Sequence, residues 1–433
     1  DALGARDDAR ARHLIEPLEA PELADLLEAL GSDARGDLIA LIRLDFDPEL
    51  LPELDETVRD QVVARLPPGE LAAAVHELDT DDAVYVVGEL EEEQRRAVLD
   101  ELPAADRIAV EQGLSYLEYT AGRLMQRELV ALPAFWTVGD AIDHMRGEPD
   151  LPEEFYDIFL VDPRNHPVGT LALSRLLRNR RGVRLSDIMD SDLTVVPVTM
   201  DQEELAFLFR QQDLTSAPVV DPDGRLIGVI TIDDVVDVID EEAEDDLMKM
   251  GGVNEDDLYR AAIDTTRARF TWLFVNLWTA VLASLVISQF EATIEKIVAL
   301  AVLMPIVASM GGNAGTQTLT VAVRALATHE LTPANALRIV WKEVIVGGFN
   351  GVMFAAIIGM LAWAWFSSPA IGGVIAMAMV ANLMIAGFCG IAIPLGLDRV
   401  GIDPALASTV LLTTVTDVIG FFVFLGLATW ILL

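Results

Sequence analysis

Two patterns of apolar positions divide the chain. Residues 9–120 read as short amphipathic helices, in which apolar positions recur at helical spacing and charged residues fill the outer face. Residues 271–433 are almost continuously apolar. A membrane-spanning helix needs roughly 20 apolar residues, and five segments reach that length, at about 271–290, 297–323, 344–366, 372–397 and 406–432. The second pattern therefore predicts a domain of five transmembrane helices.

The amphipathic half contains a repeat. The segment Glu22–Leu30 recurs further along the chain as Glu70–Leu78, and repetition of this kind is typical of a helical superhelix. We interpret its leucine and alanine stripes as core positions.

A second repeat occupies residues 124–240. Leu160–Pro163 and Val219–Pro222 are matching strand-then-turn segments, and each precedes a glycine and another apolar strand. Leu124–Met125 and Ile188–Met189 are expected to open the two copies. This repeated βαββα pattern resembles a tandem cystathionine-β-synthase (CBS) domain pair, a regulatory module.

The two copies differ where such pairs contact an adenosine nucleotide. The second copy has Gly228, Thr231 and Asp234 in a G-x-x-T-x-x-D arrangement that looks like this contact. The first copy has Ala172 and Arg175 at the matching positions. The resemblance therefore implies at most one-sided binding, with ATP at the second copy.

Charge separates the same two halves. The chain carries 30 Lys or Arg and 69 Asp or Glu, of which positions 271–433 hold only five and seven. Positions 1–270 therefore carry 25 basic and 62 acidic side chains, and we expect no nucleic acid partner because phosphates would be repelled. The single cysteine, Cys389, excludes a disulfide framework and a cysteine zinc site. Adaptation to salt, or a GC-rich genome, is an alternative explanation for this acidic and lysine-poor composition.

Basic residues near the span ends predict the orientation. If the acidic half is cytoplasmic, seven of these residues lie inside and only Lys296 lies outside. We therefore expect a cytoplasmic N-terminal domain and an external C-terminus. The chain shows no secretory signal and opens at Asp1 rather than methionine, which leaves its true start open.

The second predicted span is rich in residues that disfavour a helix. Pro305 is followed by Gly311–Gln317, and we expect this stretch to loosen the helix and turn backbone carbonyls toward a cavity. Gly312, Asn313 and Gln317 are then candidate pore residues. The alternative is a seam of small residues at which helices pack.

Asp417 is the only charge inside any predicted span, and no Lys or Arg within the spans can neutralise it. Intramembrane charges are costly and usually functional. The carboxylate is either protonated and bonded to a neighbouring helix, or paired with a cation. Thr413, Thr416 and Gly420 share its helical face, which predicts a polar stripe with Thr416 and Asp417 in a pore.

An acidic run links the two halves. Residues 233–246 hold nine carboxylates in fourteen positions, in a predicted helix that leads to the first span. Carboxylates at this density repel one another unless cations neutralise them, and Mg²⁺ takes oxygen ligands of this kind. The alternative is a solvated acidic face.

This order of parts resembles the MgtE magnesium channels. Pro305 with Gly311–Gln317 and Arg324–Thr328 looks like that family's second span, and Asp403–Leu406 with Thr416–Gly420 looks like its fifth. The resemblance implies a multidomain membrane protein with an all-α superhelical N-domain, an α/β CBS-domain pair and a five-helix all-α transmembrane domain. The expected boundaries are 1–122 for the N-domain, 123–187 and 188–245 for the CBS domains, 246–270 for a connecting plug helix and 271–433 for the pore domain.

The resemblance also implies a homodimer in membrane lipid, with a pore between the protomers. Asp417 matches the family's pore aspartate, which holds a hydrated Mg²⁺, and Asp403 matches an acidic position at the cytoplasmic mouth. Tyr85 stands where the family has an aspartate, so we expect at least one regulatory Mg²⁺ site to be lost or rearranged. Further positions match the family's regulatory Mg²⁺ ligands: Glu49, Asp81, Asp201, Glu203, Asp213, Asp234, Asp237, Glu242, Asp245 and Asp246.

The function implied is a channel in the bacterial inner membrane that imports Mg²⁺ down its electrochemical gradient and is closed by cytosolic Mg²⁺. We expect no enzyme, since the chain contains neither GxxxxGK[ST] nor HExxH. One alternative is a proton-coupled secondary transporter of another cation or solute, in which Asp417 carries the proton. Another is a non-conducting sensor. Selectivity among Mg²⁺, Co²⁺, Mn²⁺ and Ca²⁺ is left open, because selectivity for an ion bound through its water shell depends on the size of the cavity and not on the identity of the residues.

Overall fold

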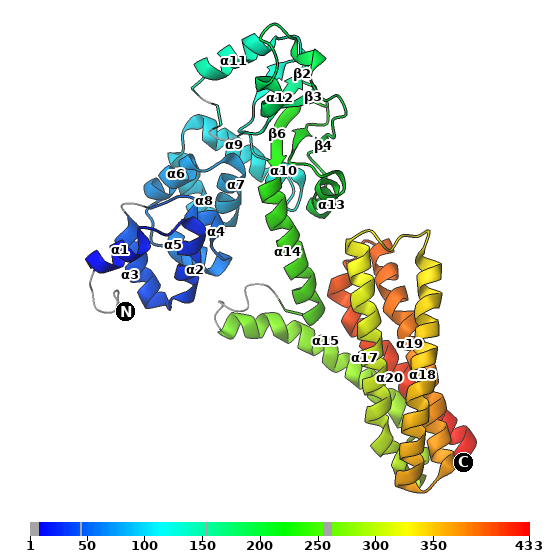
Figure 1. Cartoon of the computed structure of the whole chain (residues 1–433). Helices are drawn as coiled ribbons and strands as arrows, with labels where there is room; N and C mark the ends of the chain where they lie inside the picture. Colours follow the sequence, from blue (N-terminus) through cyan, green and yellow to red (C-terminus); the bar gives the residue numbers. More distant parts are fainter. Residues whose placement is uncertain (1–7, 44–45, 150, 153–154, 254–261) are drawn as a thin grey trace. The chain divides into compact units, whose positions relative to one another are not determined.

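The computed structural model describes residues 8–43, 46–149, 151–152, 155–253 and 262–433. The chain divides into two compact units, Asp1–Glu241 and Glu242–Leu433. We call them the soluble unit and the membrane unit and describe each by itself (Figure 1).

The soluble unit begins with an all-helical domain, as the sequence predicts. The repeat found in the sequence corresponds to α2 and α6, which occupy equivalent positions in its two copies. The helices are α1 (Asp8–Ile15), α2 (Ala20–Ala29), α3 (Ser32–Ile42), α4 (Leu50–Glu53), α5 (Glu56–Val63), α6 (Pro68–Glu77), α7 (Thr80–Glu89), α8 (Glu92–Glu101), α9 (Ala104–Leu114) and α10 (Ala121–Leu124).

Two arginines repeat one structural role in this domain. The guanidinium of Arg35 donates to Leu27 O at 2.8 Å and to Leu30 O at 2.9 Å, at the end of α2. Further along the chain, Arg95 donates in the same way to the carbonyls of Val87 and Leu90, at the end of α7. Carbonyls at a helix C-terminus lack intrahelical partners and carry a partial negative charge, so a cation there stabilises the helix end.

The CBS pair forms two three-stranded sheets of the same topology. The register repeats as the sequence predicts, because Leu160 pairs with Gly169 in the first copy and Val219 with Gly228 in the second. The first two strands of each sheet are parallel and the last two are antiparallel. The strands are β1 (Ala131–Pro133), β2 (Asp157–Val161), β3 (Pro167–Ala172), β4 (Val196–Pro197), β5 (Ser216–Val220) and β6 (Leu226–Thr231), with α11 (Val138–Gly147), α12 (Leu173–Leu177), the 3₁₀ helix η2 (Leu185–Asp187) and α13 (Gln202–Gln212).

The segments expected to open the two copies are exchanged between them in space. Met125 packs on Gly228 in the last strand of the second copy, and Met189 packs on Gly169 in the last strand of the first. A Cβ at either glycine would lie too close to the methionine sulfur, at 2.7 Å for Gly228 and 2.8 Å for Gly169. The absence of a side chain at each glycine therefore leaves room for the methionine of the segment expected to open the other copy. The sequence repeat does not reveal this long-range contact.

Helix α14 (Ile232–Gly251) follows β6 directly and runs through the acidic segment. The sequence predicts a separate plug helix over residues 246–270, and the described helical parts of that range belong to two different helices. Its first residues form the end of a helix that begins at Ile232, residues 254–261 lie outside the described part, and residues 262–270 begin the next helix. The start of the helix is anchored by Val235 and Val238, which are buried in the core of the second CBS copy.

The membrane unit contains the five predicted spans. Helices long and apolar enough to cross a membrane cover Thr265–Ser288, Ala299–Ala327, Ala336–Phe366, Pro369–Arg399 and Ser408–Leu432. They belong to α15 (Ala262–Ser288), α17 (Ala299–Ala327), α18 (Ala336–Phe366), α19 (Pro369–Arg399) and α20 (Pro404–Leu432), and the short α16 (Glu291–Lys296) joins the first two.

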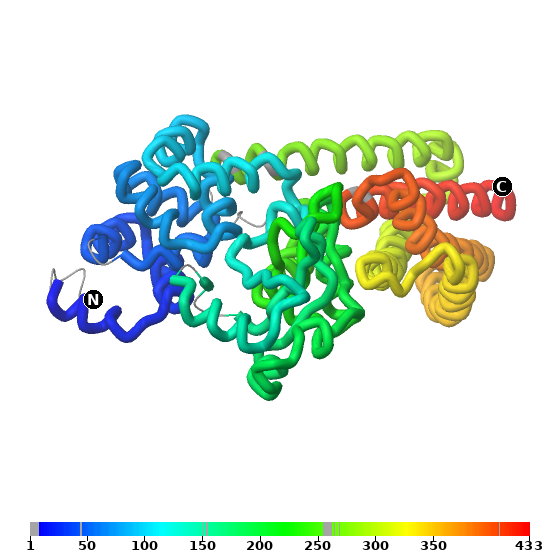
Figure 2. The backbone as a smooth tube through the Cα atoms, turned by 90° about the horizontal axis from the view of Figure 1, so that it is seen from above, coloured from blue at the N-terminus to red at the C-terminus, as the bar shows by residue number. Residues whose placement is uncertain are grey.

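Small residues hold the bundle together. In Figure 2 the helices α18 and α19 lie side by side and are viewed nearly end-on. A Cβ on Gly347 would lie 2.4 Å from Leu383 O, and a Cβ on Gly387 would lie 2.6 Å from Glu343 O. Backbones this close gain van der Waals contact, which drives helix association in lipid.

Candidate ion pathway and regulatory carboxylates

Helix α17 remains helical through Pro305 and Gly311–Gln317, so the prediction of a loosened helix is wrong. The reason is packing. Gly311 lies against Asn382 of α19, where a Cβ would be 2.3 Å from its Nδ2, and Gly315 lies against Leu412 of α20, where a Cβ would be 3.0 Å away. These two glycines form a seam between helices, which was the alternative for this segment.

The other predicted residues of this span lie away from the seam. Asn313 is exposed and its Nδ2 lies 3.5 Å from Ser309 Oγ, while a Cβ on Gly312 would meet nothing within 4 Å. Gln317 is also exposed and lines a pocket of about 110 Å³ with Glu343, whose carboxylate accepts a hydrogen bond from Thr318. The polar groups therefore face outward from this protomer or into that pocket.

The Asp417 carboxylate is half-buried in α20, and no hydrogen bond or ion pair reaches it from any residue that the structure describes. Thr416, the other pore candidate of this helix, is fully buried. Its hydroxyl donates to the carbonyls of Leu412 and Thr413, at 3.0 and 3.1 Å. Thr416 is therefore bonded within its own helix, whereas the aspartate accepts no such bond from the described residues.

Asn382, a fully buried side chain in the middle of α19, was not predicted as a site residue. Its Nδ2 donates to Val307 O of α17 at 2.8 Å, and its Oδ1 has no partner within the described residues. Gly420 of α20 lies close beside it. The available signal was an asparagine inside the fourth apolar segment, and such residues commonly bond across membrane helices.

At the start of α20, Asp403 ties the end of α14 to the helix bundle. Asp403 caps α20 by accepting the Ala405 N–H at 2.8 Å, and it also lies 2.8 Å from the Lys249 ammonium. The Thr409 hydroxyl donates to Met250 O at 3.2 Å. Three contacts of different kinds thus fix the last turn of α14, because Met250 also packs in an apolar cluster of the bundle.

Carboxylates crowd this junction. Burial, and then the charge of Asp403, raises the pKa of Asp246 to about 6. Lys249 also pairs with Asp245. Burial lowers the pKa of Lys249, but bonds to Asp245 and Asp403 outweigh it and hold that pKa above its ordinary value. Glu242, one turn earlier, is partly exposed. The acids at this junction were predicted from the sequence, whereas the lysine that neutralises them was not.

A second group of carboxylates gathers in the soluble unit, from the start of α7 and the start of α14. Burial, followed by the charge of Asp234, raises the pKa of Asp81 well above its ordinary value. Burial, with Glu49 and Asp234, raises the pKa of Asp82 to about 7. Burial also raises the pKa of Asp234 to about 6, although a hydrogen bond from Thr231 opposes this.

Further acids surround this group. Burial and Asp79 raise the pKa of Glu49, and burial, Glu128 and Asp233 raise that of Asp79. Asp237 is exposed along α14, and burial followed by Asp233 raises its pKa. Each pKa is raised because the charged form is destabilised, which a bound cation would relieve. We call the following residues the acidic cluster: Glu49, Asp79, Asp81, Asp82 and Asp234.

The predicted ligands on α13 are separated. Asp201 caps its N-terminus and accepts the Glu203 N–H at 3.0 Å, whereas Asp213 ends the helix in a left-handed conformation, with φ 52°. At about 1.5 Å per residue the two ends are about 18 Å apart, so one ion cannot bridge them within a protomer. Across the described residues, no three His, Cys, Asp or Glu side chains converge closely enough to hold a metal ion.

Tyr85, the expected departure from the family, lies one turn after Asp81 on α7. Its ring is covered by the guanidinium of Arg59, at 4.4 Å from the ring centroid. Arg59 is buried, with 2% exposure. A protein cation therefore occupies the side of α7 where a metal-binding carboxylate was expected.

The predicted nucleotide contact in the second copy is occupied by the protein's own bonds. The Thr231 hydroxyl donates to Asp234 Oδ2 at 2.8 Å, and Asp234 is itself a member of the acidic cluster, where its charge acts on Asp81 and Asp82. Gly228 is covered by Met125. Thr231 and Asp234 are therefore bonded to each other, Gln126 also donates to the Thr231 hydroxyl at 3.3 Å, and Gly228 is covered by the segment expected to open the first copy.

Known proteins similar to this chain match it over nearly its whole length. Family models match residues 304–427 (MgtE, divalent cation transporter), 7–119 (MgtE intracellular N domain) and 185–241 (CBS domain). The chain is 32% identical to the magnesium transporter MgtE of Thermus thermophilus over 434 residues, covering 99% of this chain and 96% of the relative. It is 27% identical to the magnesium transporter MgtE of Bacillus subtilis over 420 residues, covering 96% and 93%. The crystal structure of the cytosolic domain of the Mg²⁺ channel MgtE in complex with ATP matches with TM-score 0.50 and 31% identity, over 55% of this chain and 97% of that one.

Proposed function

The chain belongs to the MgtE family of magnesium transporters, and from this premise we propose that it is a Mg²⁺ channel closed by cytosolic Mg²⁺. The observation that carries the proposal is the Asp417 carboxylate, which lies inside a span without a hydrogen bond or ion pair from the described residues. An unneutralised carboxylate in a membrane is costly. A hydrated divalent cation in a pore supplies the missing charge.

We place the pore between two protomers and assign five residues to its lining or mouth. The exposed faces of Asn313 and Gln317 support this assignment, since a second copy can cover them. Thr416 is assigned to helix packing. The proposed location is the bacterial inner membrane, with the soluble unit in the cytoplasm and the C-terminus outside. The five residues are Asp417, Asn313, Gln317, Gly312 and Asp403.

Passage through this pore needs no chemical energy. With an inside-negative potential of about 100 mV, the electrical free energy of a divalent cation falls by about 4.6 kcal/mol on entry. The direction of flow is therefore set by the membrane potential and the Mg²⁺ concentrations.

Closure is proposed to act through α14, which begins beside the acidic cluster and ends at Asp403. Mg²⁺ offsets the repulsion among the crowded carboxylates and holds α14 in place. When Mg²⁺ falls, repulsion loosens α14 and frees the pore mouth. The regulatory ligands proposed are Asp81, Asp234 and Glu49 in the cluster, with Asp245 and Asp246 at the mouth. Positions assigned to the same role with fewer supporting contacts are Asp201, Glu203, Asp213, Asp237 and Glu242.

The sequence predicts two roles for Asp234, as a nucleotide contact and as a regulatory Mg²⁺ ligand, and we assign it to ion binding. Its neighbours Asp81 and Asp82 are carboxylates, which repel a nucleotide's phosphates and attract a cation. The domain boundaries proposed are those expected from the sequence, and the plug segment, residues 246–270, begins with the last turns of α14.

The test is Mg²⁺ uptake into proteoliposomes driven by an inside-negative potential, without a pH gradient. Wild type is compared with Asp417→Asn, and with Asp398→Asn as a matched control, since Asp398 is an exposed aspartate at the end of α19. Uptake that is abolished only in Asp417→Asn supports the channel. Uptake that requires a proton gradient supports the secondary transporter, and uptake unchanged in Asp417→Asn contradicts the pore assignment.

A further inference from the structure

The side chain of Asn382 connects three helices inside the membrane unit. Asn382 lies near the middle of α19 and is fully buried. Its Nδ2 donates to Val307 O of α17 at 2.8 Å. The same amide lies against Gly420 of α20, where a Cβ would be 3.0 Å from both the Nδ2 and the Oδ1 atoms. One asparagine of α19 therefore contacts α17 and α20 at the same time.

Both neighbouring helices have a glycine where the amide reaches them. A Cβ on Gly311 of α17 would lie 2.3 Å from the Nδ2 of Asn382, which is closer than two unbonded atoms can approach. A Cβ on Gly420 would force the amide or α20 to shift slightly. Small residues at such positions let membrane helices pack closely. We call these three residues the asparagine junction: Asn382, Gly311 and Gly420.

The amide oxygen of Asn382 is not satisfied by the protein that the structure describes. Its Oδ1 is buried and has no hydrogen-bond partner among the described residues, and an unsatisfied buried acceptor is costly. Leucine branches at the same atom as asparagine and would fill the space without this cost. Stability alone therefore does not explain why the residue is an asparagine.

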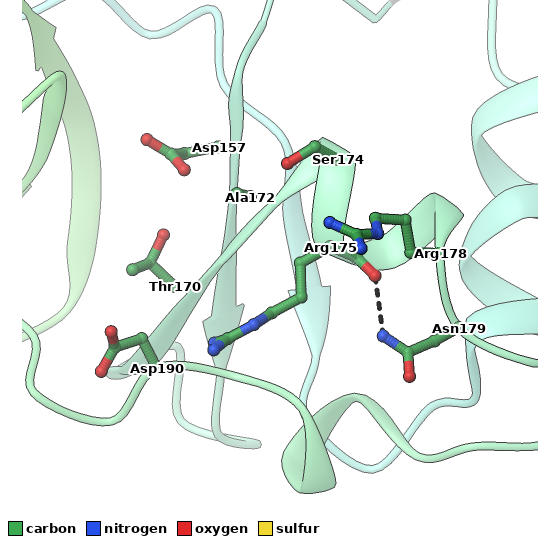
Figure 3. Close-up of a pocket in the computed structure, with 8 residues that line it drawn as sticks. All are labelled: Asp157, Thr170, Ala172, Ser174, Arg175, Arg178, Asn179 and Asp190. Atoms are coloured by element: carbon green, nitrogen blue, oxygen red, sulfur yellow. Dashed lines mark hydrogen bonds between the residues drawn. The ribbon is translucent and has the colours of Figure 1, made fainter.

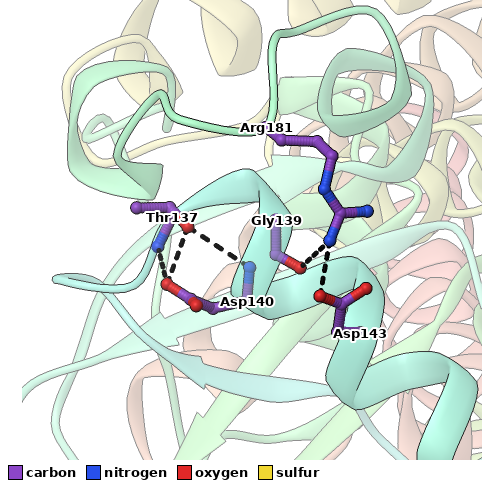
Figure 4. Close-up of polar contacts among 5 residues, drawn as sticks. All are labelled: Thr137, Gly139, Asp140, Asp143 and Arg181. Carbon is purple, nitrogen blue, oxygen red and sulfur yellow. Dashed lines mark hydrogen bonds and ion pairs between the residues drawn. The ribbon is translucent and has the colours of Figure 1, made fainter.

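Two polar contacts in the soluble unit differ from this one. Asn179 donates to Arg175 O at 2.8 Å beside a cavity (Figure 3), and because Asn179 is partly exposed, water can reach its oxygen. At the start of α11, the N–H and the hydroxyl of Thr137 both donate to Asp140, at 2.9 and 2.7 Å (Figure 4). The Oδ1 of Asn382 has neither water-accessible surface nor a donor among the described residues.

A buried polar side chain of this kind selects one arrangement of packed helices. In coiled coils a single buried asparagine fixes the register at a cost in stability, and side-chain amides bond across membrane helices. A slide of α17 would break the bond to Val307 O. A one-turn slide of α20 would place Thr416 or Phe424 against the amide, and both side chains are larger than that of Gly420. The asparagine junction therefore defines the register of α17 and α20 on α19.

The junction also determines how α20 presents Asp417. Thr416 and Gly420 are four residues apart on one face of α20, and both are buried. Asp417 follows Thr416 directly, which places it about 100° further around a helix of 3.6 residues per turn. Asp417 therefore lies on the flank of the buried face, where it is half-buried. A rotation of α20 would change the direction of its carboxylate.

We propose that Asn382 is a positioning residue for Mg²⁺ passage, which sets the register and rotation of α20 and so the place of the Asp417 carboxylate. Asn382 does not touch the ion. This inference rests on the proposed role of Asp417 in the pore.

Asn382→Leu is the direct test, because it keeps the branching of the side chain and removes the bond to Val307 O. Val307 O remains the acceptor for the N–H of Gly311 within α17. The substitution therefore leaves no new unsatisfied acceptor and removes the one at Oδ1. The midpoint of thermal unfolding in detergent should not fall.

The experiment measures initial Mg²⁺ uptake into proteoliposomes over a range of external Mg²⁺, with a fixed inside-negative potential and the soluble unit facing a Mg²⁺-free interior. In Asn382→Leu we expect the half-saturating Mg²⁺ concentration to rise about 10-fold, which corresponds to the loss of one hydrogen bond to the hydrated ion. The maximal rate should stay close to that of wild type.

Two further variants define the contact. Gly420→Ala presses on the amide from α20 and should raise the half-saturating concentration in the same direction, and it decides the matter if Asn382→Leu does not fold. Asn276→Leu is the matched control, since Asn276 is an exposed asparagine in the first span, and it should behave as wild type.

Two results would overturn the proposal. One is a lower maximal rate and a lower unfolding midpoint with an unchanged half-saturating concentration, which is the behaviour of a packing residue. The other is uptake by Asn382→Leu and Gly420→Ala that matches wild type. Asp417→Asn is measured alongside. Unchanged uptake in Asp417→Asn rejects the pore assignment together with this inference, whereas loss of uptake there with wild-type saturation in Asn382→Leu rejects the positioning role alone.

Discussion

The ammonium of Lys249 lies 2.8 Å from the Asp403 carboxylate, so the last turn of the acidic helix is tied to the first turn of the helix that carries Asp417. Both side chains are about one-third exposed. An ion pair at this exposure contributes about 1 kcal/mol at most. It is therefore strong enough to favour docking of α14 and weak enough to be overcome when neighbouring carboxylates repel.

Lys249→Met removes the positive charge that bonds to Asp245 and Asp403. We expect α14 to dock less firmly, so that amide hydrogens of residues 246–251 exchange about fivefold faster without Mg²⁺, as a loss of about 1 kcal/mol implies. Lys296→Met is the control, because Lys296 is exposed on α16. Equal exchange in wild type and Lys249→Met would show that the pair does not hold the helix.

Asp82→Asn removes one charge from the acidic cluster while keeping the shape of the side chain. Without Mg²⁺ the soluble unit should resist limited proteolysis for longer than wild type, because repulsion falls. The additional protection that Mg²⁺ gives should shrink, because less charge remains to neutralise. Asp100→Asn on the exposed face of α8 is the control. A variant that loses protection in the absence of Mg²⁺ would contradict the repulsion mechanism.

The same cluster predicts a dependence on pH. Asp82, with a pKa of about 7, and Asp234, with one of about 6, bind protons more tightly in this compact state than in an opened one. Because these carboxyl groups have raised pKa values in the compact state, proton binding stabilises that state. This stabilisation is complete below the ordinary carboxyl pKa and is lost as the pH rises through the raised values. Mg²⁺-free protein should therefore resist proteolysis at pH 5.5 and lose this resistance at pH 7.5, and Asp82→Asn should reduce the difference. Resistance that increases with pH would reverse the predicted sign.

Tyr85→Ala removes the ring beneath the Arg59 guanidinium. A cation over an aromatic face at a partly exposed site contributes about 0.5–1 kcal/mol, and the exposed fraction of Tyr85 is 46%. We expect the free energy of urea unfolding of the N-domain to fall by about that amount. Tyr85→Phe keeps the ring and should resemble wild type. If the alanine and phenylalanine variants unfold alike, the contact is not stabilising.

The architecture could be predicted because its signals are local. Five apolar segments of sufficient length became five helices, and the repeated strand-turn-strand pattern became two sheets of one register. The exchange of Met125 and Met189 between the CBS copies could not be predicted, since it depends on which distant segment fills the space above a glycine.

The site could be predicted in part. Asp417 stands out as the one charge in an apolar segment, and the acids of α14 stand out by their density. Lys249 has no comparable signal, because one lysine in an acidic run reads as a surface residue. Gly311–Gln317 was misread because glycine disfavours a helix in isolation, whereas here Asn382 and Leu412 pack into the space that the glycines leave.

The proposed function requires that one ion both passes through the protein and closes it. We would measure the initial rate of Mg²⁺ uptake into proteoliposomes while Mg²⁺ on the cytoplasmic side is raised from zero into the millimolar range. The soluble unit of the protein must face that side, and a fixed membrane potential must keep the driving force inward. We predict fast uptake that falls cooperatively as cytoplasmic Mg²⁺ rises, and no uptake with Asp417→Asn at any concentration. A rate that falls only in proportion to the driving force would contradict closure by Mg²⁺.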